Sequence, residues 1–281
     1  MKRKWGVVIA TILAAAVLAG CGGQSQSQAP ASTPAAGGSG EAASALPAQV
    51  QKIKDAGVLK VGVKEDVPKF GYLDPAKGVH EGMEIDLARR IAKEIFGDET
   101  KVQFTGVNAK TRGPALDNGE IDLVIATFTI TEERKNSWNF SDPYFTDHVG
   151  FLVLADSGIE SWKDLDGKTI GVAQSASTRA ALTQQAEEDG IKVEFMEFAT
   201  YPEIKAALDS GRVHAFSVDQ SILWGYKDDK NVMLPDKFAP QEYGIATKKS
   251  NTELAEFVNN IINDMKASGE MDQLYEKWGL K

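Results

Sequence analysis

The chain has 281 residues, about a quarter of them charged, and a formal net charge of −9. An acidic chain with no basic run is poorly suited to binding nucleic acid, or an anionic membrane surface, through its charge. Its single cysteine excludes an intrachain disulfide and argues strongly against a structural zinc site.

The first residues predict export. A basic start at residues 2–4 precedes an apolar stretch at 5–18, which is too short for a typical spanning helix and ends in two small residues before Cys21. This order predicts a lipoprotein signal peptide over 1–20, with Cys21 as the acylated (palmitate-carrying) residue. An ordinary secretory signal with an incidental cysteine is the alternative. We therefore expect a protein anchored by lipid on the extracytoplasmic face of the cell membrane, the periplasmic side in a Gram-negative cell.

A flexible tether is predicted over 21–45, where Gly, Ser, Gln, Ala and Pro dominate without hydrophobic periodicity. The rest of the chain alternates between strand and helix patterns, which is typical of parallel α/β sheets. The expected strands are 58–63, 101–107, 121–127, 149–154, 168–173, 192–198, 213–218 and 242–247, and the expected helices are 82–95, 111–118, 178–189, 201–210, 252–269 and 271–278.

The pattern restarts after the middle of the chain, which predicts two lobes. We expect crossovers near 150–155 and 241–248, so that lobe 1 holds 46–152 and 243–281 and lobe 2 holds 153–242. Ligands of such folds bind at the carboxyl ends of the strands, here between the lobes.

Motifs for cofactors and catalysis are absent from the sequence. There is no Gly-x-Gly-x-x-Gly, no P-loop lysine motif and no Gly-x-Ser-x-Gly. His80, His148 and His214 lie far apart without the spacing of metal ligands. We expect no cofactor, no metal and no enzymatic activity.

Three polar clusters at strand ends remain as candidate sites. Thr131 begins a predicted helix on which Arg134 could clamp a carboxylate. The loop 174–178 precedes a helix and suits an anion, and Asp219 follows a strand where its carboxylate could take an ammonium group. A solvated arginine, plain helix capping in the loop, and capping by Asp219 are the alternatives.

The same clusters carry a resemblance to a known family. Asp122, the run 129–134 (TITEER) and the run 140–144 (FSDPY) resemble the signature of bacterial extracellular solute-binding proteins, family 3, supported by 82–87, 164–168 and 277–279. The resemblance implies a two-lobed, periplasmic-binding-protein-like α/β fold (type II) with two crossover strands at its hinge. It further implies the substrate-binding component of an ABC importer, which closes on an amino acid and contacts a permease. We expect a monomer.

The resemblance also implies roles for individual residues. Arg134 with Thr129 matches the clamp for the ligand α-carboxylate. The Thr127 carbonyl and the Asp219 carboxylate match contacts to the α-ammonium. The closing loop of the second lobe corresponds to Ser175 and Thr178.

Two departures from many relatives point to the ligand side chain. Lys64 stands where an acidic residue is common, and Arg112 stands where relatives are usually apolar. With Tyr201 they resemble the pocket of aspartate/glutamate-binding members, which implies L-glutamate or L-aspartate as ligand. Exposed positions for both cations, or Lys110 in place of Arg112, are the alternatives. A receptor for another polar amino acid such as glutamine, a dehydratase-like enzyme, and an additional adhesin or sensor role also stay open.

Overall fold

The computed structural model describes residues 46–280. The expected signal peptide, Cys21 and the tether lie outside these residues. Within 46–280, no helix combines the length and apolarity that crossing a membrane requires.

Lobe 1 is built on a five-stranded sheet in the order β5-β1-β6-β14-β7. Strands β1, β5 and β6 are parallel, while β14 runs antiparallel to both β6 and β7. The strands are β1 (Leu59–Val63), β5 (Val102–Gly106), β6 (Leu123–Ile125), β7 (Trp138–Phe140) and β14 (Ala246–Lys248), and the helices are α1 (Ala48–Ala56), α2 (Met83–Phe96), α3 (Arg112–Asp117), α4 (Glu132–Ser137), α8 (Thr252–Ser268) and α9 (Glu270–Trp278).

Lobe 2 is built on a second sheet in the order β10-β9-β11-β8-β12, with β13 also paired to β8. Strands β9, β10 and β11 are parallel, and β8 is antiparallel to each of its partners. The strands are β8 (Phe145–Leu154), β9 (Thr169–Ala173), β10 (Glu194–Phe198), β11 (Ala215–Asp219), β12 (Asn231–Met233) and β13 (Phe238–Tyr243), and the helices are α5 (Thr178–Asp189), α6 (Tyr201–Asp209), α7 (Gln220–Tyr226) and a 3-10 turn (Trp162–Leu165).

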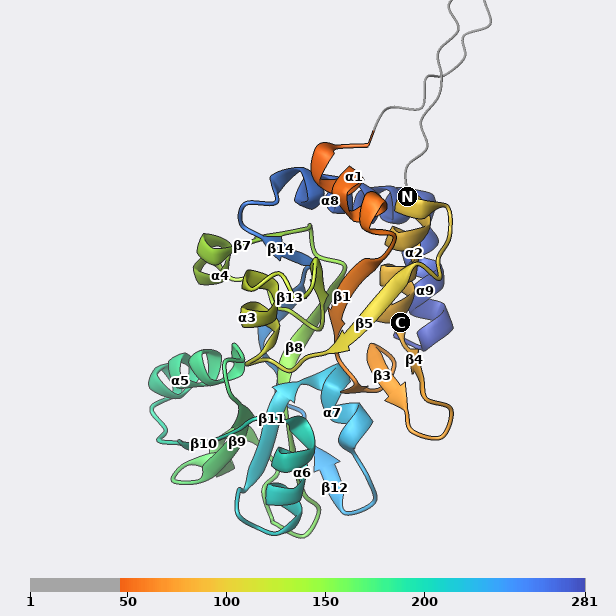
Figure 1. Cartoon of the computed structure of the whole chain (residues 1–281). Coiled ribbons are helices and arrows are strands. Elements are labelled where there is room, and N and C mark those ends of the chain that lie inside the picture. The colour runs from red at the N-terminus through yellow and green to blue at the C-terminus, as the bar shows by residue number, and fades with distance from the viewer. Residues whose placement is uncertain (1–45, 281) are drawn as a thin grey trace, which may run out of the picture. The chain divides into compact units, whose positions relative to one another are not determined.

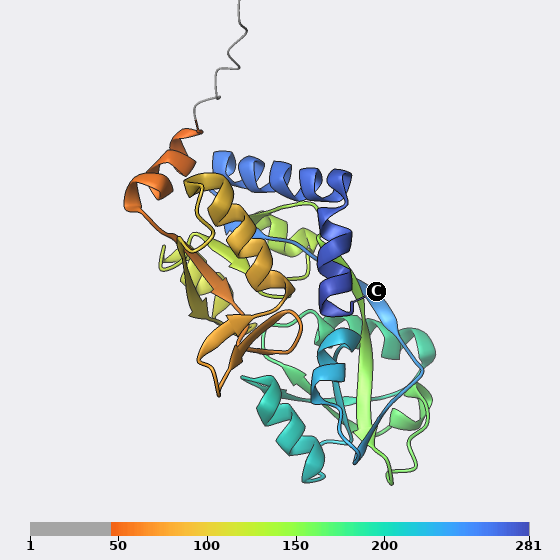
Figure 2. The ribbon, with the colours of Figure 1, turned by 90° about the vertical axis from the view of Figure 1, so that its right-hand side faces the viewer.

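The chain passes between the sheets twice, and the first passage lies earlier than predicted. It falls at 141–144, between β7 and β8, not at 150–155. The expected boundary at 152 is therefore wrong, because β8 is one continuous strand that pairs with β11, β12 and β13 of lobe 2. The second passage lies between β13 and β14, inside the expected range, and divides the single strand expected at 242–247. Figures 1 and 2 show β8 and β13 running side by side away from lobe 1.

A small antiparallel sheet that the sequence did not suggest lies between β1 and α2. It consists of β2 (Asp66–Val67), β3 (Gly71–Asp74) and β4 (Val79–Glu81). Gly82, which joins it to α2, has φ +131°, and a Cβ there would meet the Phe70 carbonyl oxygen at 2.0 Å. Only glycine therefore allows this sheet to lie so close to the start of α2.

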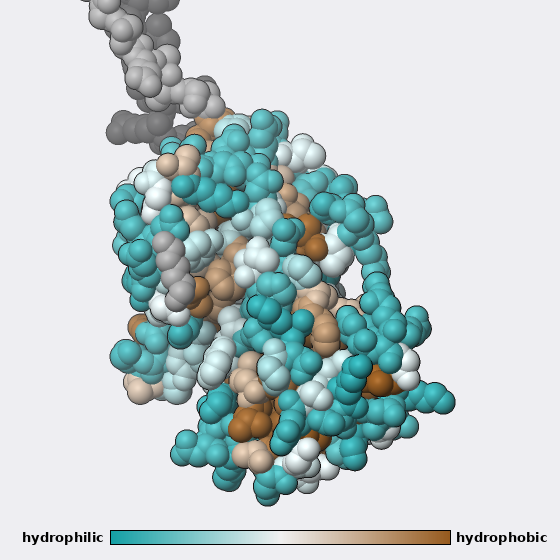
Figure 3. All heavy atoms as spheres, turned by 180° about the vertical axis from the view of Figure 1, so that it is seen from behind, coloured by the Kyte–Doolittle hydropathy of each residue, from teal (hydrophilic) through white to brown (hydrophobic). Residues whose placement is uncertain are grey.

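The helices pack their apolar faces against the two sheets. In α2, for example, Ile85, Leu87, Ile91 and Ile95 are at most 1% exposed, as expected for an amphipathic helix on a sheet. On the face that Figure 3 shows, hydrophilic residues cover most of the surface and hydrophobic ones form small patches. The interior is thus apolar, so the buried charged residues described below stand out.

Candidate ligand-binding cleft

A groove of about 660 Å³ lies where residues of the two lobes meet. Thr129 and Arg134 line it from lobe 1, and Ser175 and Ser177 line it from lobe 2. The hydroxyl of Ser177 donates to Gln241 Oε1 at 2.7 Å, and the hydroxyl of Thr129 donates to the same oxygen at 2.9 Å. The predicted clamp and the predicted loop therefore face each other.

Arg134 joins the two lobes. Thr131 caps α4 by accepting from the Arg134 backbone amide at 3.1 Å, as the sequence suggested. The guanidinium donates to the Thr129 carbonyl at 2.7 Å and to the Ser175 carbonyl at 3.0 Å. Burial lowers the pKa of Arg134 to about 9, with Arg112 contributing in the same direction. The group remains a cation at neutral pH and is partly buried beside the groove, which suits it to bind a carboxylate.

Arg112 is buried, being only 3% exposed at the start of α3. Its Nη1 donates to the carbonyls of Ala126 at 2.7 Å and Thr127 at 3.0 Å, while Nε has no protein partner. The alternative of an exposed Arg112 is therefore wrong. The Thr127 carbonyl, expected to meet an ammonium group, faces this guanidinium in the structure. Thr127 itself has φ +44°, a strained conformation for a β-branched residue.

Both arginines lie against one aromatic ring that the sequence analysis missed. The guanidinium carbons of Arg112 and Arg134 are 4.0 Å and 4.8 Å from the ring centroid of Phe128. Contacts of this kind favour a desolvated cation by about 2 kcal/mol. In the sequence, Phe128 lies between Thr127 and Thr129 at the end of a buried strand, so it looks like an ordinary residue of the hydrophobic core.

Lys64 contacts lobe 2 from the end of β1. It is 1% exposed, and its Nζ lies 4.3 Å from the centroid of the Tyr201 ring at the start of α6. Burial lowers the pKa of Lys64 to about 8, although Asp66 opposes this shift. Lys64 and Tyr201, which were each expected to line the ligand pocket, thus lie side by side, and Lys64 is not an exposed charge.

Asp219 ends β11 and is 4% exposed. Its carboxylate accepts a short hydrogen bond from the Tyr243 hydroxyl, and no side-chain cap on α7 is present. Burial, reinforced by Asp147, raises the pKa of Asp219 to about 7. Of the other lobe 2 predictions, Thr178 is buried at the start of α5, whereas Ser175 is exposed and contributes its carbonyl.

Glu84 is a buried carboxylate that the sequence analysis did not assign. It is 0% exposed near the start of α2, and burial raises its pKa. Three buried polar atoms of this region have no hydrogen-bond partner in the protein, namely Glu84 Oε2, Arg112 Nε and Thr127 Oγ1. Unsatisfied buried groups are costly, so their gathering in one place is typical of a site that completes itself with a polar ligand or water.

The charges of the cleft are unequal. Among the described side chains of this region, the cations are Lys64, Arg112 and Arg134, and the buried carboxylates are Glu84 and Asp219. The positive charges outnumber these two carboxylates by one, and the half-buried carboxylate of Asp66 offsets this surplus in part at Lys64. Asp147 is bonded to Ser221 and lines a different cavity. A zwitterion would leave the surplus in place, whereas an amino acid with one extra carboxylate would remove it.

Residues 59–281 match the family model of bacterial extracellular solute-binding proteins, family 3. The chain belongs to this family. The predicted two-lobed, periplasmic-binding-protein-like α/β fold is confirmed by this match and by solved structures.

The relatives of this solute-binding protein are named for different amino acids. The chain is 38% identical over 281 residues to the glutamine-binding protein GlnH of an ABC transporter in Bacillus subtilis, and the match covers 99% of this chain and 97% of that protein. It is 31% identical over 231 residues to the glutamate-binding protein GluB of Corynebacterium glutamicum, covering 78% and 77%. A solved ancestral amino-acid-binding protein, a precursor of cyclohexadienyl dehydratase, has a TM-score of 0.71 at 33% identity, covering 82% and 98%.

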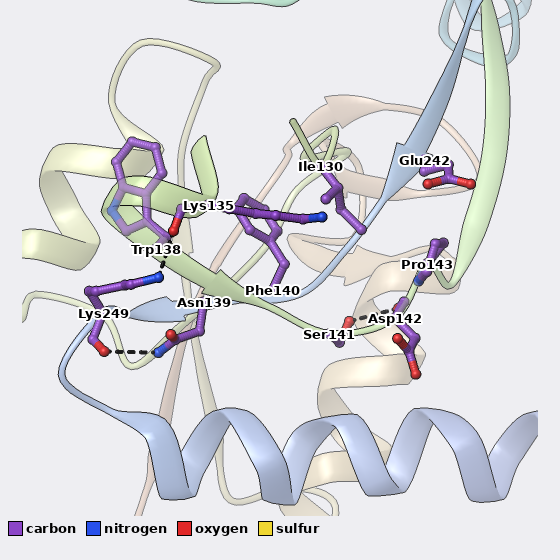
Figure 4. Close-up of a pocket in the computed structure, with 10 residues that line it drawn as sticks. All are labelled: Ile130, Lys135, Trp138, Asn139, Phe140, Ser141, Asp142, Pro143, Glu242 and Lys249. Atoms are coloured by element: carbon purple, nitrogen blue, oxygen red, sulfur yellow. Dashed lines mark hydrogen bonds between the residues drawn. The ribbon is translucent and has the colours of Figure 1, made fainter. Parts of the chain in front are cut away.

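A second cavity of this solute-binding protein, of about 440 Å³, lies beside β7 in lobe 1 (Figure 4). None of the nine predicted ligand contacts lines it. Its polar groups bond to one another, since Lys249 Nζ donates to the Lys135 carbonyl at 2.6 Å and Asn139 Nδ2 donates to the Lys249 carbonyl at 3.2 Å. The contacts of this cavity give no indication of a ligand.

Within 46–280 no group of three potential metal ligands occurs, and His80 contacts Glu65 at 2.9 Å.

Proposed function

We propose that this solute-binding protein captures an acidic amino acid, L-glutamate or L-aspartate, and delivers it to the permease of an ABC importer. The surplus positive charge of the closed cleft carries this proposal. Lys64 and Arg112 are both buried, neither has a hydrogen-bonded carboxylate partner in the described chain, and a ligand carboxylate would compensate them. Arg134 and Asp219 serve the α-carboxylate and α-ammonium groups in this assignment.

Capture proceeds by hinge closure. Arg134 already bonds to the Ser175 carbonyl across the groove, and Lys64 already contacts Tyr201. An amino acid bound to lobe 1 adds contacts that exist only when lobe 2 is closed, and so shifts the equilibrium toward the closed form. A permease that recognises the closed form then receives only loaded protein.

Glutamine is the second candidate. A relative at 38% identity is named a glutamine-binding protein. Glu84 Oε2 is a buried acceptor without a partner, which the amide nitrogen of glutamine could satisfy. The charge surplus weighs against it, because a neutral side chain adds no negative charge beside Lys64 and Arg112.

Isothermal titration calorimetry on the purified protein separates the candidates. We expect L-glutamate or L-aspartate to bind at least about tenfold more tightly than L-glutamine, a difference of about 1.4 kcal/mol. Arg112→Ala should weaken the acidic ligands by about 100-fold, as expected when one partner of a buried charge pair is removed, and glutamine much less. Arg179→Ala, which removes an exposed lobe 2 cation paired with Glu197, is the matched control and should leave the affinity for both kinds of ligand unchanged.

A preference for glutamine over both acids would overturn the acidic assignment and favour the second candidate. An enzymatic role receives no specific support from the cleft, where Asp219 is engaged by Tyr243. Turnover of a prephenate-like acid would contradict a pure binding role.

We also propose that the mature protein is a monomer held on the extracytoplasmic face of the membrane by lipid on Cys21, followed by the tether at 21–45. The basic start, the apolar stretch and the small residues before Cys21 support this. Labelling of cells with an alkyne fatty acid should tag the protein, and Cys21→Ser should abolish the tag. Equal labelling of both would contradict the anchor.

A further inference from the structure

Glu84 is a buried carboxylate to which the acidic-ligand assignment gives no contact with the ligand. It is the second residue of α2 and is 0% exposed. The helix N-terminus favours a negative charge, but full burial of a carboxylate still carries a large desolvation cost. A buried carboxylate at this position therefore needs an explanation in its contacts.

Glu84 Oε1 accepts two hydrogen bonds. One comes from the backbone amide of Thr127 at 2.6 Å and the other from the Tyr144 hydroxyl at 2.5 Å. Thr127 has φ +44°, in the left-handed region that is unfavourable for a residue with a Cβ. A hydrogen bond from the Thr127 amide offsets a cost of this size, so Glu84 can hold the turn at Thr127 in this conformation.

The same turn holds Arg112. The Ala126 carbonyl belongs to the same peptide unit as the amide that Glu84 binds, and the Thr127 carbonyl belongs to the next one; both accept from Arg112 Nη1, at 2.7 Å and 3.0 Å. The guanidinium then lies over Phe128, the next residue. The orientation of Arg112 thus depends on the backbone conformation that Glu84 fixes.

We propose that Glu84 is a positioning residue for ligand recognition, which acts through the Thr127 turn to orient Arg112. This rests on the proposed function in one respect, the assignment of Arg112 to the ligand side chain. Glu84 itself needs no contact with the ligand. Its effect on affinity is then transmitted through Arg112 and disappears when Arg112 is absent.

A double-mutant cycle on ligand affinity tests this. Glu84→Met keeps an unbranched side chain of similar length but removes the acceptor, whereas Glu84→Gln keeps an acceptor oxygen for Thr127 and removes the charge. For the amino acid that the wild type binds most tightly, we expect Glu84→Met to raise Kd about tenfold or more, the value of one strong hydrogen bond. In the Arg112→Ala background the same change should raise Kd less than about threefold, because coupled residues are not additive. Glu84→Gln should stay within about threefold of the wild type.

Equal losses in both backgrounds would overturn the proposal and leave Glu84 a residue of general stability. A loss in Glu84→Gln as large as in Glu84→Met would assign the effect to charge and also overturn it. If Glu84→Met does not fold by circular dichroism, Glu84→Asp, which keeps the charge and shortens the reach, replaces it in the cycle. Because the cycle uses the tightest ligand, a preference for glutamine would refute the acidic assignment alone, whereas no effect of Arg112→Ala on any ligand would refute both.

Discussion

Lys64 keeps its charge in a place where burial works against it. Its pKa is lowered to about 8, mainly by burial; Asp66 opposes this shift and Arg112 adds to it. A ligand carboxylate beside Nζ would favour the protonated form and raise the pKa again. Proton binding to Lys64 and binding of an acidic ligand are therefore linked.

The linkage predicts a pH dependence with a definite sign. As pH rises through about 8, free Lys64 loses its proton, and binding of an acidic ligand must then restore it. The Kd for glutamate should consequently rise relative to the Kd for glutamine, by up to about tenfold per pH unit above the free pKa. Calorimetry with both ligands at pH 7, 8 and 9 measures the ratio, in which titration of the shared α-groups cancels. Lys64→Met is the control and should give a Kd ratio that does not depend on pH. If the ratio changes with pH in this variant as it does in the wild type, a group other than Lys64 titrates.

Single site residues could be predicted from the sequence where they lie at the end of a strand pattern or at the start of a helix pattern, and not elsewhere. Lys64 and Asp219 follow predicted strands, and Arg112 and Arg134 lie in the first turns of predicted helices, so their gathering could be expected. Glu84 lies in 82–87, which supports the family resemblance, but the sequence assigned it no role. Its burial could not be told from that of Glu94 in the same helix, which is exposed and paired with Arg90 at 2.7 Å. The difference arises from the Thr127 turn, which is distant in sequence.

At the scale of elements, α7 of lobe 2 packs closely on the small sheet of lobe 1. The Tyr226 hydroxyl donates to the Asp66 carbonyl at 2.6 Å, and a Cβ on Gly225 would lie 2.9 Å from Cδ of Pro68. The proline ring cannot rotate away as a flexible side chain would. The absence of a side chain at Gly225 therefore allows the lobes to approach to this distance.

Gly225→Ala should impede closure without harming either lobe. Overpacking typically costs about 1–3 kcal/mol, so we expect the Kd of the tightest ligand to rise about tenfold. Alanine is also a better helix former than glycine, so α7 itself should not be destabilised. Calorimetry of Gly225→Ala and of its double variant with Pro68→Ala measures the effect. The double variant removes the atoms that clash and should recover to within about threefold of the wild type; equal losses in both would place the defect within α7.

The sequence predicted the long helices and the buried parallel strands, because their hydrophobic periodicity is strong. It missed the small sheet, whose strands are two to four residues long, too short for a periodic signal, and are separated by turns that contain Pro68 and Gly78. It also placed the first passage between lobes too late. The residues 145–148 carry polar side chains such as Asp147, and only the pairing with β13 shows that they belong to β8.

At the scale of the whole molecule, ligand binding and closure share their contacts, so the ligand must stabilise the folded protein. A ligand at 100 times its Kd stabilises the native state by about 2.7 kcal/mol. For a chain of this size each kcal/mol raises Tm by about 2–4 °C, which predicts a rise of roughly 5–10 °C with the cognate amino acid. Differential scanning fluorimetry with glutamate, aspartate and glutamine in turn measures this rise.

Arg134→Ala should lose the shift in Tm with every amino acid, because Arg134 serves the α-carboxylate common to all of them and joins Thr129 to the Ser175 carbonyl across the groove. Arg179→Ala also removes one cation, but from an exposed pair with Glu197, and should keep the full shift. Loss of the shift in both variants would indicate a general effect of charge. A full shift in Arg134→Ala would exclude this residue from the α-carboxylate clamp and leave the closure of the lobes to other contacts.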